Sequence, residues 1–426
     1  MRLRRLAGAL ALALVASAAC TPDEPGSTDQ ATTNLEVISW WTSGSEEQAL
    51  NVLFGAYREA HPEVTIVNAT VAGGGGSNAS VVLAQRLLRG DPPDSWQTFP
   101  GGALRQYASQ GQLSDVSAVA RDSGLTANLP KVILDGLTVD GKQYGVPTSS
   151  HRGNVLFFNQ KLLARAGVAN PSASYTPEEF VSDLAKLDAA GVTPLCLGAK
   201  DRFTTTALFK NVLLGVVGAD GWSRITADRF DWRGTQVRQA LTQFGQILDY
   251  ADPEAAGLSW DAATGKLASG GCAFETMNDS AYGELVKAGA KEGTDFGAVP
   301  YPGTDGNYVA VVDTFVRARQ AKNGRNASDF LTVIGAPEVQ VEFSKAKGSV
   351  PVRTDADLST LSPYQRSAAE SLRTQTVLWS ITHGSVMSPQ FQQGFYDAVE
   401  SYVRSRDARA FSNTLTDAMR RQPPAK

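Results

Sequence analysis

The residues with the clearest chemistry are two adjacent tryptophans, Trp40 and Trp41, and the carboxylate of Glu46 that follows them. An indole ring offers a flat apolar face, and a carboxylate accepts hydrogen bonds from hydroxyl groups. This combination suits a ligand with an apolar C–H face and a rim of hydroxyls. Successive side chains of an extended segment point to opposite sides. We therefore expect one indole to stack on a ligand while the other packs beneath the loop; the alternative is that both belong to the core.

Three polar residues with the same chemistry stand at the ends of expected elements. Glu46 lies in the first turn of a helix, where it either accepts from a ligand or compensates the helix dipole. Gln97 ends a short strand and offers both a donor and an acceptor. Asp313 follows a strand over residues 308–312 and is able to accept from two hydroxyls. We predict that all three contact a ligand.

Catalytic and metal-binding motifs do not account for these residues. The chain has no Gly-x-Ser-x-Gly elbow and no His-Glu-x-x-His pair, and its three histidines, His61, His151 and His383, are far apart. The glycines 73–76 lack the Gly-Lys-Ser/Thr that completes a phosphate-binding loop. We expect no enzyme, no metal and no cofactor. A secreted glycoside hydrolase, which needs two flanking carboxylates, is the enzyme alternative.

The elements that position these residues follow an alternating order. Apolar patterns predict strands over 35–40, 64–72 and 94–98, and helices over 46–60 and 79–88. Strand, helix, strand, helix, strand implies parallel pairing with right-handed crossovers, so the fold class is α/β. Ligands of open α/β sheets bind at the carboxyl ends of the strands, where Trp40, Trp41 and Gln97 stand.

The rest of the chain continues in this manner. An Asp-Gly turn at 140–141 predicts a hairpin over 139–147. Thr176, Pro177 and Glu179 form a capping box that starts a helix ending near 190. Further strands are expected over 155–158, 272–277, 296–298 and 308–315, and further helices over 131–137, 206–217, 235–248, 262–269, 282–288, 327–334, 337–346, 363–372, 389–403 and 407–420.

Composition bounds the function classes. The chain of 426 residues exceeds what one core usually supports, and 42% apolar residues are enough for two lobes. Its formal charge is −4, with no basic patch, which argues against nucleic-acid binding.

The first residues resemble an export signal. Arg2, Arg4 and Arg5 precede an apolar run over 6–16 and small residues ahead of Cys20. That run is too short to span a bilayer, which takes about 20 residues. A cysteine after small residues resembles the acylation site of bacterial lipoproteins, so we expect a signal over 1–20, lipid on Cys20 and a flexible tether over 21–34. The alternative is a freely secreted protein.

Cysteine usage fits an extracytoplasmic protein. With Cys20 carrying lipid, Cys196 and Cys272 remain as a pair, and such pairs tend to be oxidised outside the cytoplasm. We expect a disulfide between them; the alternative is two separate buried thiols.

Six motifs in order resemble family-1 extracellular solute-binding proteins of bacterial carbohydrate ABC importers, in particular the glucose- and mannose-binding lipoproteins. The resemblance spans residues 35 to about 405. The motifs are the Trp-Trp-Thr-Ser-Gly-Ser-Glu stretch at 40–46, Gly-Asp-Pro-Pro-Asp at 90–94 with Gln97, the hairpin and Gly-Val-Pro at 139–147, the segment 271–279, Lys-Gly-Ser-Val-Pro at 347–351, and His-Gly-Ser at 383–385.

The resemblance implies a two-lobe, periplasmic-binding-protein-like fold of type II with a hinge and an interlobe cleft. The first lobe is expected over 35–147 plus 300–350, and the second over 148–299 plus 351–426. It also implies the ligand contacts Trp40, Trp41, Glu46, Gln97, Trp260, Asp279, Asp313, Lys347 and His383, with His151, Arg152, Phe203 and Phe99 as further candidates. Phe99 and Ser280 depart from the family pattern, which points to a differently shaped pocket.

The function implied is capture of a mono- or small oligosaccharide, with glucose or mannose favoured, by closure of the cleft. The expected partners are the sugar and the ABC permease subunits, without nucleic acid, and the protein is expected to be a monomer on the outer face of the cell membrane. The other possibilities are a binding protein for a different solute and a co-receptor for a sensor kinase.

Overall fold

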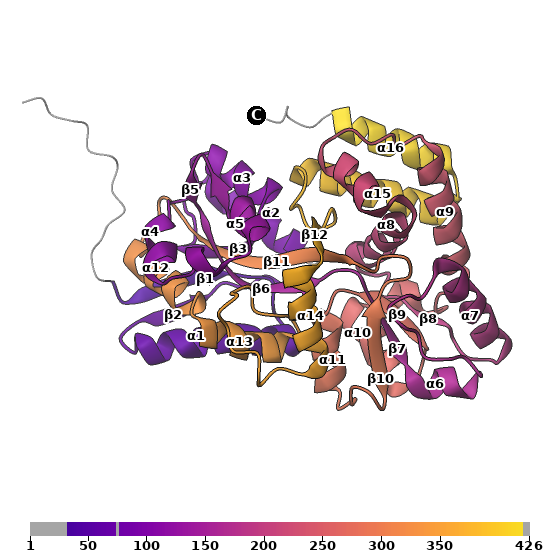
Figure 1. The fold of residues 1–426 in the computed structure, drawn as a ribbon. Helices are drawn as coiled ribbons and strands as arrows, with labels where there is room; N and C mark the ends of the chain where they lie inside the picture. Colours follow the sequence, from indigo (N-terminus) through magenta and orange to yellow (C-terminus); the bar gives the residue numbers. More distant parts are fainter. Residues whose placement is uncertain (1–31, 74–75, 421–426) are drawn as a thin grey trace, which may run out of the picture.

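The computed structural model describes residues 32–73 and 76–420, which form two α/β halves side by side (Figure 1). The expected signal, Cys20 and the tether up to residue 31 lie outside the described residues. The first strand begins at Asn34, the last residue of the expected tether.

A six-stranded sheet lies in the half that contains the N-terminal elements. Its main path runs β12-β11-β3-β1-β2, and β6 pairs with β11. β1 is parallel to β2 and β3, whereas β11 is antiparallel to β3 and β6. The strands are β1 Asn34–Ile38, β2 Thr65–Asn68, β3 Ser95–Thr98, β6 Gly145–Arg152, β11 Asn307–Arg317 and β12 Thr376–Trp379.

The other half is built on a four-stranded sheet of order β10-β7-β9-β8. Its strands are β7 Val155–Asn159, β8 Leu195–Cys196, β9 Phe274–Met277 and β10 Phe296–Pro300. Only Gly153 and Asn154 separate β6 in one sheet from β7 in the other. The chain therefore crosses from one sheet to the other through a bend of two residues.

Helices cover both sheets (Figure 1). They are α1 Gly44–Ala60, α2 Ser77–Leu88, α3 Gly102–Ser109, α4 Ser117–Asp122, α5 Lys131–Leu137, α6 Gln160–Arg165, α7 Pro177–Ala189, α8 Arg202–Thr226, α9 Thr235–Leu248, α10 Trp260–Ser269, α11 Ser280–Lys287, α12 Gly324–Ile334, α13 Pro337–Lys347, α14 Pro363–Thr374, α15 Pro389–Ser405 and α16 Ala408–Arg420, with short 3-10 turns at Thr126–Asn128 and Ala255–Gly257.

Local sequence signals explain several element ends. The Thr176 hydroxyl accepts from the Glu179 backbone N–H and the Glu179 carboxylate accepts from the Thr176 backbone N–H, which completes the predicted capping box of α7. Asp140 and Gly141 both have positive φ, 50° and 76°, in the turn between β4 (Thr138–Val139) and β5 (Lys142–Gln143). These are the signs of φ that a two-residue hairpin turn of type I′ requires.

Two large apolar cores divide along the sheets, one around β1 and β11 and one around α8, α9 and α15. The predicted boundary placed everything after residue 350 in the second lobe. Val352, Ala368 and Leu372 instead pack in the core of the six-stranded sheet. α14 contacts β11 before the chain enters α15, so part of the segment after residue 350 packs with the first half and not with the second.

A disulfide joins Cys196 of β8 to Cys272, which precedes β9; the Cα atoms are 5.5 Å apart. This is the pair that the cysteine count led us to expect. Cys196 and Cys272 are both buried among Phe157, Phe203 and Leu267.

We expect the described disulfide to contribute about 4 kcal/mol to the free energy of unfolding, because it closes a long loop of the unfolded chain. Reduction is therefore expected to lower the midpoint of urea unfolding. A thiol count on the denatured, unreduced domain lacking Cys20 is expected to find no free thiol. Two free thiols per chain would contradict the pairing.

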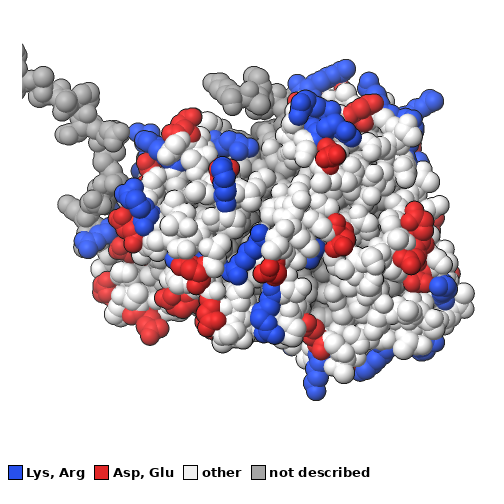
Figure 2. All heavy atoms as spheres, in the orientation of Figure 1, with Lys and Arg blue, Asp and Glu red and all other residues white. Residues whose placement is uncertain are grey.

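Acidic and basic side chains are interspersed on the face that Figure 2 shows. None of the helices within residues 32–73 and 76–420 is both long and apolar enough to cross a bilayer.

Candidate functional site

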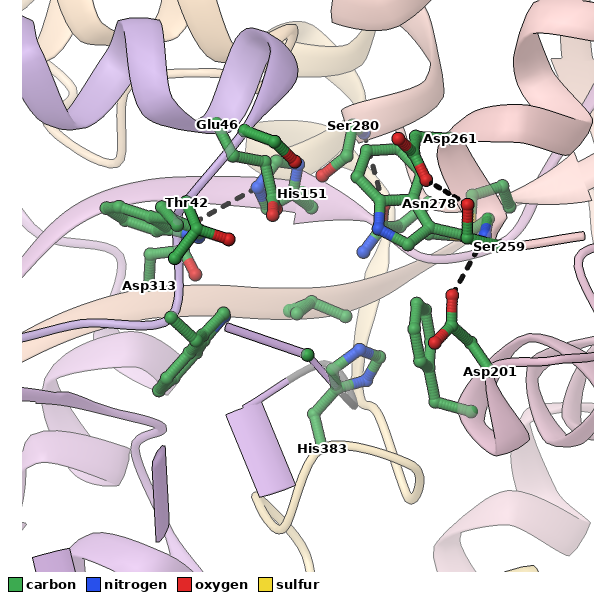
Figure 3. Close-up of a pocket in the computed structure, with 18 of the residues that line it drawn as sticks. Thr42, Glu46, His151, Asp201, Ser259, Asp261, Asn278, Ser280, Asp313 and His383 are labelled. Atoms are coloured by element: carbon green, nitrogen blue, oxygen red, sulfur yellow. Dashed lines mark hydrogen bonds and ion pairs between the residues drawn. The ribbon is translucent and has the colours of Figure 1, made fainter. Parts of the chain in front are cut away.

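A cavity of about 270 Å³ lies between the two halves. The first half lines it from the loop after β1, the start of α1, the residue after β3, β6, β11 and the end of α13. The second half lines it from the starts of α8 and α10, the end of β9, the start of α11, the loop after β12, and α15. Figure 3 shows Glu46, His151 and Asp313 on one side and Asp201, Ser259 and Asp261 on the other.

The two tryptophans divide as the alternation predicts. Trp40 is half-buried, lines the cavity and lies 5.3 Å from the ring of Phe99 between centroids. A Cβ at Gly76 would come within 2.9 Å of the Trp40 indole, so the backbone of this residue packs against the ring. Trp41 is 1% exposed and contacts Phe343 and Phe315 in the core, and it also lines the cavity.

Lys347 joins the first half to the second at the cavity wall. Its Nζ donates to Glu46 Oε1 at 2.6 Å and to the Ser280 hydroxyl at 2.9 Å. The side chain is almost fully buried, and its ammonium lies 5.3 Å from the Trp41 ring centroid, within cation–π range. Burial raises the pKa of Glu46, and Lys347 opposes that shift. Glu46 is thus held by an ion pair as well as lying in the first turn of α1.

Asp313 forms the floor of the cavity on β11. Its Oδ1 accepts from Gln97 Nε2 at 3.2 Å, and Gln97 Oε1 in turn accepts from the Ser39 hydroxyl at 2.8 Å. Gln97 is buried and does not line the cavity, so the structure places it beneath Asp313 and not at the wall where we expected it. Burial of Asp313 opposes its ionisation, but the hydrogen bond and charge of His151, with Lys347 and Gln97, lower its pKa overall.

His151 on β6 lies between two carboxylates. Its Nε2 is 3.0 Å from Asp313 Oδ2, and its Nδ1 contacts Asp279 Oδ1. Asp279 is fully buried at the start of α11 and also accepts from the backbone N–H of Arg152 at 3.0 Å. Asp279 therefore lies behind His151 and not at the cavity wall.

His383 lies in the loop after β12, and Figure 3 shows it on the opposite side of the cavity from Glu46 and His151. Its Nδ1 is within hydrogen-bond distance of the hydroxyls of Ser380 and Thr382, and its ring meets Phe99 edge-on at 5.3 Å. Burial, reinforced by the charge of Lys210, lowers the pKa of His383 to about 3. A neutral imidazole at this place both donates and accepts.

The second half contributes an aromatic wall. Trp260 and Phe203 line the cavity as predicted, and Tyr396 joins them. The Trp260 backbone N–H donates to Asp201 Oδ2 at 2.9 Å, which places the Asp201 carboxylate beside the tryptophan.

Most of the predicted contacts converge on this one cavity. Those that line it are Trp40, Trp41, Glu46, Trp260, Asp313, Lys347 and His383, together with His151, Phe203 and Phe99. Arg152 does not; its guanidinium bonds Ser371, Gln375 and the Asn307 carbonyl.

Several lining residues had not been predicted: Thr42, Ser43, Gly73, Lys200, Asp201, Ser259, Asp261, Met277, Asn278, Ser280, Val311 and Tyr396. Asp201, Ser259 and Asp261 stand at helix starts that face the cavity. Polar residues at the first turn of a helix after a loop were the available signal, but they are common enough at helix ends that they do not single out a site.

A comparison with family models matches residues 42–341 to the bacterial extracellular solute-binding proteins. This chain belongs to that family. The relatives include an uncharacterized ABC transporter extracellular-binding protein of Pyrococcus horikoshii, which is 30% identical over 98% of this chain and 95% of its own length. A probable sugar-binding periplasmic protein of Brucella suis is 29% identical over 92% of this chain and 93% of its own length.

Solved structures agree on the fold. A chitin oligosaccharide binding protein superposes with a TM-score of 0.81 over 91% of this chain and 98% of its own length, at 18% identity. The chain thus has the two-lobe, periplasmic-binding-protein-like fold of type II that the motifs implied. The relatives and fold neighbours are binding proteins, so the family is not one of enzymes, and the glycoside hydrolase alternative is set aside.

Proposed function

We propose that this solute-binding protein is the extracytoplasmic sugar receptor of an ABC importer. It captures a mono- or small oligosaccharide between its lobes and delivers it to a membrane permease. The observation that carries the proposal is the cavity between the sheets, where the half-buried Trp40 faces a wall of acceptors and donors. The name of the Brucella relative supports a sugar as ligand.

The chemistry of the cavity favours a ring with hydroxyls on its rim. Trp40, Phe99, Phe203 and Trp260 supply aromatic surface from both halves. Asp313, Glu46 and the neutral His383 supply hydrogen-bonding groups that a sugar hydroxyl pairs with. A cavity of about 270 Å³ lies just below the usual range for ligand sites, which begins at about 300 Å³, and this favours one or two sugar units. Glucose or mannose are the first candidates.

The proposed location follows from the family and from the start of the chain. Cys20 is the proposed lipid attachment site, and the residues between Cys20 and the start of β1 are the proposed tether. A diacylated or triacylated anchor retains a protein at a membrane far better than one chain does. The receptor would then act as a monomer beside its permease.

We expect calorimetry on a domain lacking residues 1–31 to find a sugar bound with micromolar or tighter affinity, about −8 kcal/mol. The panel is glucose, mannose, galactose, xylose and common disaccharides, with glycine and a dipeptide as non-sugar controls. A few charge-assisted hydrogen bonds of about 1.5–3 kcal/mol each, less the cost of association, reach that affinity. Heat from an amino acid or a peptide, with none from any sugar, would overturn the proposal.

A further inference from the structure

The imidazole of His151 has a carboxylate at each of its two nitrogens. Nε2 lies 3.0 Å from Asp313 Oδ2, and Nδ1 contacts Asp279 Oδ1. His151 is 2% exposed, Asp313 3% and Asp279 0%, so water does not compete for these contacts. The three side chains come from β6, β11 and the start of α11, and thus connect both halves of the molecule beneath the cavity.

Proton counting decides which form of the imidazole fits. A neutral imidazole has one N–H and one lone pair, so it satisfies one ionised carboxylate and turns a lone pair toward the other. An imidazolium has two N–H groups and satisfies both. Asp279 and Asp313 each accept from a further donor: the backbone N–H of Arg152 at 3.0 Å on Asp279, and Gln97 Nε2 at 3.2 Å on Asp313.

We propose that His151 is a positioning residue, held as an imidazolium between Asp279 and Asp313, and that it fixes Asp313 as an ionised acceptor at the floor of the cavity. His151 also touches the cavity itself, but its ring nitrogens are both engaged by the carboxylates. Asp279, which we had expected to bind ligand, acts on the ligand through His151.

The charged neighbours of His151 leave this assignment intact. Burial opposes its charge, and Lys347 on α13 opposes it as well, but Asp279 and Asp313 prevail and raise the pKa of His151. The other titratable groups that interact with His151 are Glu46 on α1, which favours the imidazolium, and His383, which is neutral. Tyr308 and Tyr364 interact with Asp279, and the charge of Arg152 acts on both tyrosines.

Nitrogen-15 NMR of the histidine side chains tests the protonation state without any ligand. The chain has three histidines, and single replacements of His61 and of His383 assign all three rings. At pH 8 we expect both ring nitrogens of His151 to give the signature of protonated nitrogen, while His383 gives that of a neutral ring. A neutral His151 at pH 8 in the wild-type protein would overturn the assignment, and the measurement itself leaves His151 and both carboxylates unchanged.

The isosteric variant Asp279→Asn tests the coupling to ligand binding. An asparagine amide is able to donate to Nδ1, so the ring keeps its place but its second proton is no longer favoured. We expect the wild-type affinity to hold at pH 8, and the affinity of Asp279→Asn to fall at least tenfold between pH 6 and pH 8. Asp188→Asn, an exposed change on α7, is the matched control and is expected to follow the wild type.

The affinity experiment on Asp279→Asn rests on the proposed function, but different results would overturn the proposed function and the positioning role of His151. If no sugar binds while the spectrum shows the imidazolium, the proposed function fails and the proton assignment holds. If sugar binds and the pH profile of Asp279→Asn matches that of the wild type, the positioning role is overturned.

Discussion

Replacing Trp40 by alanine is expected to weaken sugar binding at least tenfold while leaving the folded domain intact. Trp40 is half-buried, lines the cavity and packs on Phe99 and the backbone of Gly76, so its loss removes a stacking surface more than a core contact. Calorimetry gives the affinity, and thermal unfolding without ligand gives the stability.

Trp41→Ala is expected mainly to lower the stability of the folded domain. The Trp41 ring is buried against Phe315 and Phe343, and loss of such a side chain typically costs about 3–5 kcal/mol of unfolding free energy.

Trp379→Ala is the matched control for Trp40→Ala, because Trp379 is also half-buried but lines a separate cavity beside α5 and α8. Equal sugar affinity in wild type and Trp40→Ala would show that Trp40 is not the platform.

The sequence predicts that one of Trp40 and Trp41 lines the cavity while the other packs in the core, but it does not predict which. Alternation along an extended segment predicts that one indole faces out and one faces in. Which of them does so depends on where Phe315 and Phe343, some 270 to 300 residues later in the chain, close over the loop. That distance along the chain is outside the reach of a local pattern.

The strand–helix order was predictable because each element carries its own periodicity and end signals. α7 begins at the predicted capping box, and the hairpin turns at the predicted Asp-Gly. β12 and α3 were not predicted. Strand 376–379 is only four residues long and pairs with β11, which lies far away in the sequence, so it has little local signature.

Among the candidate contacts, Gln97, Asp279 and Arg152 do not line the cavity. β3 is buried along its whole length, so its sequence does not show which side chain faces the ligand and which supports it from below. Asp279 belonged to a motif of the family, but a motif fixes a position in the chain and not the direction of a carboxylate. The structure turns both side chains toward Asp313 and His151, where they hold other groups in place.

Lys347→Met is expected to lower the free energy of unfolding by about 3–5 kcal/mol, because removing one partner of a buried pair leaves the other charge uncompensated. Lys347 opposes the burial-driven rise in the pKa of Glu46 more strongly than His151 does. In the variant, that pKa rises further above 4.5. Ionising the buried Glu46 carboxylate therefore destabilises the folded variant as the pH rises above the ordinary pKa of glutamate. The loss of unfolding free energy relative to wild type is expected to be larger at pH 7 than at pH 4.

The double variant Glu46→Gln/Lys347→Met separates the pair from its parts. A neutral amide in place of Glu46 removes the stranded charge, so we expect the double variant to recover much of the stability lost by Lys347→Met alone. Urea unfolding of the two single variants, the double variant and the wild type closes the cycle. Additive losses would mean that the 2.6 Å contact between Lys347 and Glu46 does not couple the residues energetically. Sugar affinity is expected to stay low in the double variant even where the fold recovers. Glu46 and Lys347 both line the cavity, and the double variant no longer presents their charged groups to a sugar hydroxyl.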